Sequence, residues 1–110
     1  MPKKINIAII GLGQIGNYLL NELNKNKSEI LIKTGKQINI AAISARNINK
    51  KRKFKINKKI FYKKPLDIIN TKKIDILIEA IGQSDGISKK IIEAALKKKI
   101  LKLKLEKRLV

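Results

Sequence analysis

The sequence predicts an α/β fold with an incomplete doubly wound parallel sheet, and three observations predict it. Isoleucine-rich runs of strand length alternate with segments whose apolar residues recur at helical spacing. Glycine closes two of these runs, at the point where a parallel strand gives way to the next helix. The 110 residues, of which 44% are hydrophobic, match one domain with a buried core.

The first strand and the first helix adjoin. Residues 4–10 are rich in β-branched residues and become nearly all apolar toward their end, which is typical of a central strand buried on both faces. Gly11 ends this run. From Gln14 the apolar residues recur every three or four positions, which predicts a helix to about Asn24.

A second helix and a second strand follow. Asn26 or Ser28 can cap a helical piece over residues 29–34. Gly35 suits the end of that piece because glycine accepts the left-handed backbone conformation. Residues 38–44 then predict a second buried strand.

The middle of the chain is polar and basic. Residues 47–59 contain few apolar anchors, and we expect this connection to be mobile. Residues 59–62 predict a short third strand. Pro65 fits the first turn of a short helix that ends at Asn70.

The last third predicts one more strand and helix. Residues 74–81 form a fourth apolar run, closed by Gly82, and Ser84 or Asp85 can cap the next helix. The apolar residues of that helix share one face: Ile87, Ile91, Ile92, Ala95 and Leu96. Residues 97–110 alternate apolar residues with lysine, which fits a half-exposed edge strand better than a buried strand.

Missing residue types exclude several chemistries. The chain has no Cys and no His, so disulfides, thiolate nucleophiles, the usual zinc sites and imidazole catalysis are excluded within it. Its first apolar run ends in Gly-Leu-Gly instead of a signal-peptide cleavage site, and polar residues interrupt its longest uncharged stretch. We therefore expect a cytoplasmic protein that makes no contact with a membrane.

The formal net charge of +19 has a compositional explanation. Of the 27 basic residues, 24 are Lys, and Lys, Ile and Asn together fill 57 positions. All three have A/T-rich codons, so nucleotide bias accounts for the charge. Nucleic-acid interfaces favour Arg and aromatic side chains, and aromatic residues make up only 4% of this chain. A nucleic-acid partner is therefore disfavoured, and a basic, non-enzymatic nucleotide- or nucleic-acid-binding module is kept as the alternative function.

Residues 11–16, Gly-Leu-Gly-Gln-Ile-Gly, fit the fingerprint of a dinucleotide-binding loop. The pattern is informative because it follows a strand and opens a helix. Gly11 would allow a tight turn, Gly13 the approach of a pyrophosphate, and Gly16 close packing of helix on strand. We therefore predict a Rossmann-type sheet that binds a nicotinamide dinucleotide through Gly11, Leu12, Gly13, Gln14, Ile15 and Gly16.

The end of the second strand bears on which dinucleotide is bound. Ser44, Ala45 and Arg46 stand where a protein selective for NAD usually has an acidic residue for the ribose hydroxyls. Arg46 instead suits a 2′-phosphate, and the cations of residues 50–52 follow it. The sequence therefore favours NADP, with NAD as the alternative.

The end of the fourth strand is a second candidate segment. Ile81 and Gly82 lie on the ligand edge expected of such a sheet and could border the nicotinamide ribose. A helix-capping turn over residues 82–86 is an equally good explanation of this glycine-rich segment.

Several segments together resemble a known family in order and spacing: residues 7–16, 34–38, 41–46, 65–66 and 76–86. Over about residues 4–96 the chain resembles the N-terminal nucleotide-binding domain of homoserine dehydrogenase. The resemblance implies an NAD(P)-dependent oxidoreductase that interconverts L-aspartate 4-semialdehyde and L-homoserine, in threonine and methionine biosynthesis. It also implies a homodimer for the full-length relatives and places Gly82 beside the nicotinamide.

The chain departs from this family near its C-terminal end. The family has a Gly-Lys-His-Val-Val-Thr-Ala-Asn-Lys type of strand and loop, whose lysine is implicated at the active site. Here residues 99–107 keep only the final lysine, so the resemblance makes Lys107 the catalytic candidate. We expect a Rossmann domain over residues 1–97 and a divergent tail over 98–110, truncated or frameshifted. The catalytic and dimerisation domain would then be absent and this chain alone inactive.

Overall fold

The computed structural model describes residues 3–45, 51–52, 55–80 and 86–104. Its centre is a five-stranded parallel sheet, in chain order β1 (Lys3–Ile10), β2 (Lys36–Ser44), β3 (Phe61–Tyr62), β4 (Ile76–Glu79) and β5 (Leu101–Lys104). The strands lie side by side in the order β3-β2-β1-β4-β5. The chain thus moves outward from β1 to β3 and then crosses to the other side of β1, which confirms the predicted Rossmann-type fold.

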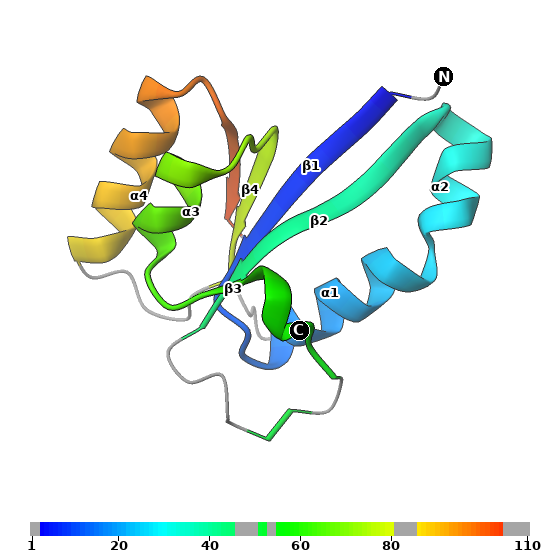
Figure 1. The fold of residues 1–110 in the computed structure, drawn as a ribbon, viewed down its shortest axis with the longest axis horizontal. Helices are drawn as coiled ribbons and strands as arrows, with labels where there is room; N and C mark the ends of the chain where they lie inside the picture. The colour runs from blue at the N-terminus through cyan, green and yellow to red at the C-terminus, as the bar shows by residue number, and fades with distance from the viewer. Residues whose placement is uncertain (1–2, 46–50, 53–54, 81–85, 105–110) are drawn as a thin grey trace, which may run out of the picture.

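Helices cover both faces of the sheet (Figure 1). α1 (Gln14–Lys25) and α2 (Lys27–Thr34) lie on one face, and α3 (Pro65–Thr71) and α4 (Gly86–Lys97) lie on the other. Gly35 ends α2 with a φ of 72°, in the left-handed conformation that the sequence predicts. Pro65 occupies the first turn of α3, also as predicted.

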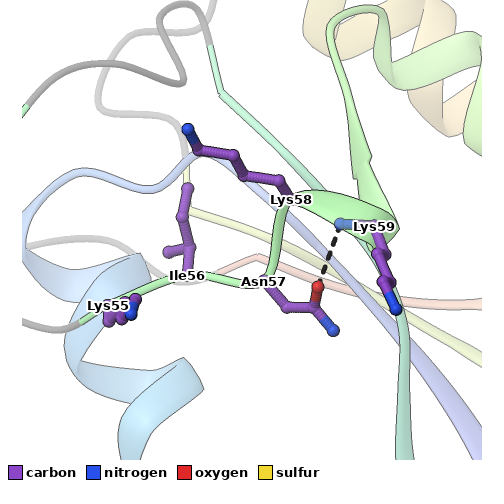
Figure 2. Close-up of a pocket in the computed structure, with 5 residues that line it drawn as sticks. All are labelled: Lys55, Ile56, Asn57, Lys58 and Lys59. Atoms are coloured by element: carbon purple, nitrogen blue, oxygen red, sulfur yellow. Dashed lines mark hydrogen bonds between the residues drawn. The ribbon is translucent and has the colours of Figure 1, made fainter.

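The third strand is shorter than the sequence predicts. Lys58–Ile60 forms a 3-10 turn (η1), and only Phe61–Tyr62 pairs with β2. The cause is local: the Asn57 side-chain oxygen accepts a hydrogen bond from the backbone N–H of Lys59 at 2.9 Å (Figure 2). This cap stabilises a turn where the apolar pattern alone favours a strand.

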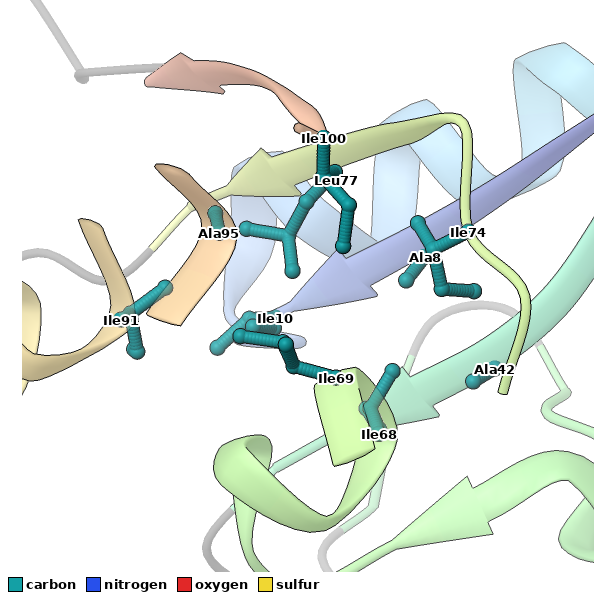
Figure 3. Close-up of a cluster of buried hydrophobic side chains, with 10 residues drawn as sticks. All are labelled: Ala8, Ile10, Ala42, Ile68, Ile69, Ile74, Leu77, Ile91, Ala95 and Ile100. Carbon is teal, nitrogen blue, oxygen red and sulfur yellow. The ribbon is translucent and has the colours of Figure 1, made fainter. Parts of the chain in front are cut away.

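Two apolar cores flank the sheet. The core under α3 and α4 (Figure 3) contains Ala8, Ile10, Ala42, Ile68, Ile69, Ile74, Leu77, Ile91, Ala95 and Ile100. The core under α1 contains Ile7, Ile9, Leu12, Leu20, Ile40, Ile43, Ala45 and Ile78. Successive residues in the second half of β1 therefore enter opposite cores, which explains why residues 7–10 are all apolar.

A β-bulge in β2 breaks the simple alternation of sides. Ile7 pairs with Ile40, but Ala8 pairs with Ala42, so Ala41 is an extra residue. As a result Ile40 and Ile43 both reach the α1 core although three positions separate them.

The C-terminal elements differ from their predicted forms in detail. In α4, Ile91 and Ala95 are buried as expected, whereas Leu96 is 70% exposed and Ile92 is also exposed. A helix advances 100° per residue, so these two side chains turn away from the α3/α4 core, and the apolar face is narrower than predicted. The capping residues expected at 84 and 85 lie outside the described residues, as do most of residues 46–54.

β5 is the predicted half-exposed edge strand. It pairs in parallel with β4, and Leu101 is 57% exposed. The sheet thus continues through Lys104, seven residues past the domain boundary expected at residue 97. Residues 105–110 lie outside the described part of the chain.

Candidate functional site

The glycine loop, residues 11–16, lies where β1, β2 and β4 end. The backbone N–H of Gly11 donates a hydrogen bond to the Ser44 carbonyl at 2.7 Å, which ties the loop to the end of β2. The N–H of Ala80 donates to the Ile10 carbonyl at 2.7 Å, which ties the end of β4 to the end of β1. The loop therefore occupies the point where the strand order reverses, which is where open α/β sheets bind ligands.

The fold itself requires two of the three glycines. Gly11 has a φ of 95°, a conformation that side chains strain. A Cβ on Gly16 would overlap the carbonyl oxygen of Gly11 and touch Ala80. The backbone conformation of the turn thus explains Gly11, and close packing of α1 against the strand ends explains Gly16.

Gly13 has no such structural reason. Its φ of −72° and ψ of −161° are extended backbone that any residue adopts. A Cβ placed on it would meet no atom within 4 Å. Gly13 is exposed and directly precedes α1, so the space beside it lies at the N-terminus of that helix. A ligand that approaches the backbone would use this space, and a side chain would fill it.

The N-terminus of α1 keeps its positive partial charge. The N-cap is Gly13, which has no side chain to accept a hydrogen bond, and the first turn of α1 contains no acidic residue. By contrast, α2 has Glu29 in its first turn and α3 has Asp67. The first-turn amides and dipole of α1 thus favour an anion in the open space beside Gly13.

A cation from the β2–β3 connection reaches this loop. The Nε of Arg52 donates a hydrogen bond to the carbonyl oxygen of Leu12 at 3.1 Å. Arg52 is half-buried, and its neighbour Lys51 is exposed. The sequence places Arg52 among the cations that follow Arg46, but it does not predict contact with a loop forty positions earlier.

The other predicted residues fall into two groups. In the described part, Gln14 and Ile15 open α1, while Ser44 and Ala45 are buried at the end of β2 beside the loop. The Ser44 hydroxyl points into the fold, 3.5 Å from the carbonyl oxygen of Lys63. The remaining predicted residues lie outside the described part of the chain and stay predictions: Arg46, Ile81, Gly82 and Lys107.

Sequence reasoning missed a buried ion pair beside the site. Glu79, the last residue of β4, is fully buried, and its Oε2 lies 2.6 Å from the Nζ of Lys102 in β5. The Lys102 side chain is only 13% exposed. Glu79 is one of two acidic residues in the apolar run of residues 74–81, and this was the available signal, but nothing local identifies its partner.

A surface pocket of about 560 Å³ lies over residues 55–59. Its lining comes from one continuous segment, and Figure 2 shows the ammonium groups of Lys58 and Lys59 pointing in different directions. Such a surface offers no convergent polar groups for a small ligand. In the described ranges, no cluster of three potential metal ligands is found, and no helix has the length and hydropathy to cross a membrane.

Sequence comparisons give consistent matches. A family model described as the NAD-binding domain of homoserine dehydrogenase matches residues 11–103. The homoserine dehydrogenase of Neisseria gonorrhoeae is 30% identical over 94 residues, which are 86% of this chain and 21% of that protein. The enzyme of Pseudomonas aeruginosa is 34% identical over 83 residues, which are 73% of this chain and 18% of that protein. The chain thus spans about a fifth of the length of these relatives.

Solved structures agree with the sequence matches. Homoserine dehydrogenase of S. aureus, at pH 7.5, superposes with a TM-score of 0.86 at 30% identity, over 98% of this chain and 28% of that one. The enzyme of Thiobacillus denitrificans has a TM-score of 0.75 at 23% identity, over 93% of this chain and 23% of that one, and shows the same fold.

Proposed function

Since this chain belongs to the family of homoserine dehydrogenase NAD-binding domains, we propose that it binds a nicotinamide dinucleotide with the diphosphate over Gly13. The observation that supports this proposal is the open space at Gly13, a position where the fold does not require glycine. A diphosphate there would meet the first-turn amides of α1, at Gln14 and Ile15, and the positive end of the helix. Gly11 and Gly16 would hold the loop in place.

The adenosine end of the cofactor would lie at the end of β2. Ser44 and Ala45 sit beside the glycine loop, and Arg46 follows them in the sequence. We expect Arg46 to bind a 2′-phosphate, which favours NADP over NAD. Replacing Arg46 by Gln should then weaken NADPH binding about tenfold and leave NADH binding unchanged. Equal loss for both nucleotides would contradict this role.

The nicotinamide end would lie at the end of β4. Ile81 and Gly82 follow that strand in the sequence and are proposed to border the nicotinamide ribose. When bound, the cofactor supplies hydride transfer to and from the substrate carbonyl carbon. This chain would hold and orient the dinucleotide by its diphosphate and ribose groups.

The activity proposed for the whole protein is that of homoserine dehydrogenase, in amino-acid biosynthesis. Lys107 remains the catalytic candidate that the family resemblance suggests. We propose residues 1–97 as the cofactor domain and 98–110 as a divergent tail whose strand β5 forms the edge of the same sheet, and we expect substrate binding and dimerisation to need a further domain. The 110-residue chain should therefore bind the nucleotide but show no NADPH oxidation with aspartate semialdehyde.

The test is nucleotide binding by a Gly13→Asp variant. Aspartate is a favoured N-cap residue, so the fold should keep its melting temperature. Its carboxylate would occupy the diphosphate position, and affinity for NADH and NADPH should fall at least about tenfold in a fluorescence titration.

The matched control adds the same charge at another helix. Ser28→Asp places a carboxylate in the first turn of α2, at an exposed position away from the glycine loop. This variant should bind both nucleotides like the unmodified chain. Equal binding by the Gly13→Asp variant would overturn the proposed site.

A further inference from the structure

The contact between Arg52 and the glycine loop has consequences beyond loop structure. Arg52 donates through Nε to the Leu12 carbonyl, and Leu12 itself is buried in the α1 core. Leu12 stands between Gly11, which is bonded to β2, and Gly13, which borders the open space. The acceptor for Arg52 is therefore part of a fixed turn.

Arginine at this position is not compositional background. The chain contains 24 Lys and only 3 Arg, so a cation without specific geometry would be lysine in most places. A guanidinium differs from an ammonium in its rigid planar fork of five N–H donors. One bond through Nε orients this plane and keeps the charge at the loop.

The place of this hydrogen bond in the loop also matters. Leu12 is adjacent to Gly13, so the guanidinium is fixed one residue from the N-terminus of α1. The helix end and the guanidinium both favour negative charge, and planar guanidinium groups match the geometry of phosphate oxygens. The N-terminus of α1 and Arg52 of the β2–β3 connection thus both place positive charge at the glycine loop.

We propose that Arg52 is a cofactor-binding residue whose guanidinium, held on the glycine loop by the Leu12 carbonyl, binds the diphosphate of the dinucleotide. This inference rests on the proposed function. The diphosphate is favoured over a 2′-phosphate because Arg52 contacts the loop itself, whereas a 2′-phosphate is expected at the end of β2 near Arg46. Arg52 should therefore contribute equally to NAD and NADP binding.

The experiment compares three variants of the 110-residue chain in titrations with NADH and NADPH. Arg52→Gln should weaken both nucleotides by a similar factor, about tenfold or more. Arg52→Lys keeps the charge but loses the fork, and should recover only part of the affinity. Lys51→Gln removes the same charge from the exposed neighbour and should change the affinity for NADH, which has no 2′-phosphate, by about twofold or less.

The outcomes separate the two levels of the proposal. Unchanged affinity in Arg52→Gln, or a loss confined to NADPH, would overturn the role of Arg52 and leave nucleotide binding standing. A lower melting temperature with unchanged affinity would likewise reduce Arg52 to a structural contact. Failure of the unmodified chain to bind either nucleotide would overturn the proposed function and this inference with it.

Discussion

Gly13 and Gly16 lie three residues apart in one loop, and the same substitution should affect them in opposite ways. Gly16→Ser puts a Cβ against the Gly11 carbonyl, and overpacking of this kind lowers the free energy of unfolding by about 1–3 kcal/mol or more. Gly13→Ser places its side chain in open space at an N-cap position, where serine is favoured. Its stability should be unchanged or higher by a few tenths of a kcal/mol.

Urea denaturation followed by circular dichroism measures both variants. Equal destabilisation would show that Gly13 is needed by the fold, and would remove the main argument for a ligand there. The Gly13→Ser protein should also bind NADPH more weakly than the unmodified chain, because its side chain fills the space assigned to the diphosphate.

At this scale the sequence predicts local chemistry well and distant contacts poorly. The glycine loop is identified by spacing within six residues, and its position after the first strand is confirmed. The bond from Arg52 to Leu12 and the pairing of Glu79 with Lys102 join residues far apart in the chain. Such pairs depend on how the strands are ordered, which no local pattern contains.

At the scale of the elements, mutation of the ion pair between β4 and β5 tests what holds β5 to the sheet. Lys102→Met would leave the fully buried Glu79 carboxylate without this cation, and loss of one partner of a buried pair costs about 3–5 kcal/mol. The double variant Glu79→Met/Lys102→Met removes both charges and should lie much closer to the unmodified chain, since apolar residues of similar size often replace such pairs without loss.

A double-mutant cycle in urea measures the coupling between these two positions. If Lys102→Met unfolds at the same urea concentration as the unmodified chain, the pair does not hold β5 to the sheet. A double variant that is as unstable as the single one would contradict the same interpretation, because the defect would then come from lost packing.

The type and order of the strands and helices follow from the periodicity of apolar residues. Which face of a helix is buried and where a strand bulges depend on contacts between elements. The sequence predicts each strand and helix in the described parts, including the edge strand in the basic tail. It does not predict the bulge at Ala41, because a bulge is a relation between two strands. It also assigns Ile92 and Leu96 to the buried face of α4, although α4 covers only the edge of a small sheet and leaves them exposed.

For the whole molecule, the net charge of +19 should oppose folding. The radius of gyration is 13.7 Å, well below the Debye length of about 30 Å at 0.01 M ionic strength. Each lysine then repels most of the other lysines, and this repulsion destabilises the compact state relative to the unfolded chain. Raising the ionic strength to about 0.15 M shortens the Debye length to about 8 Å and should raise the melting temperature by about 5 °C.

A thermal melt at the two NaCl concentrations provides the measurement. Sucrose at matched osmolality is the control, because it stabilises compact states without screening charge. A melting temperature that stays constant or falls with salt would show that the 8 acidic residues already balance the local potential.

The presence of glycine at position 13 also bears on how this sequence evolved. Glycine codons begin with two guanines, so the A/T-rich bias that accounts for Lys, Ile and Asn works against every glycine, and only 6 are present. Backbone geometry or close packing preserves Gly11, Gly16 and Gly35. Neither backbone geometry nor close packing requires glycine at position 13, so the A/T-rich mutational bias alone would have replaced Gly13 before these three glycines. Its retention is the outcome that selection for the proposed nucleotide binding would produce.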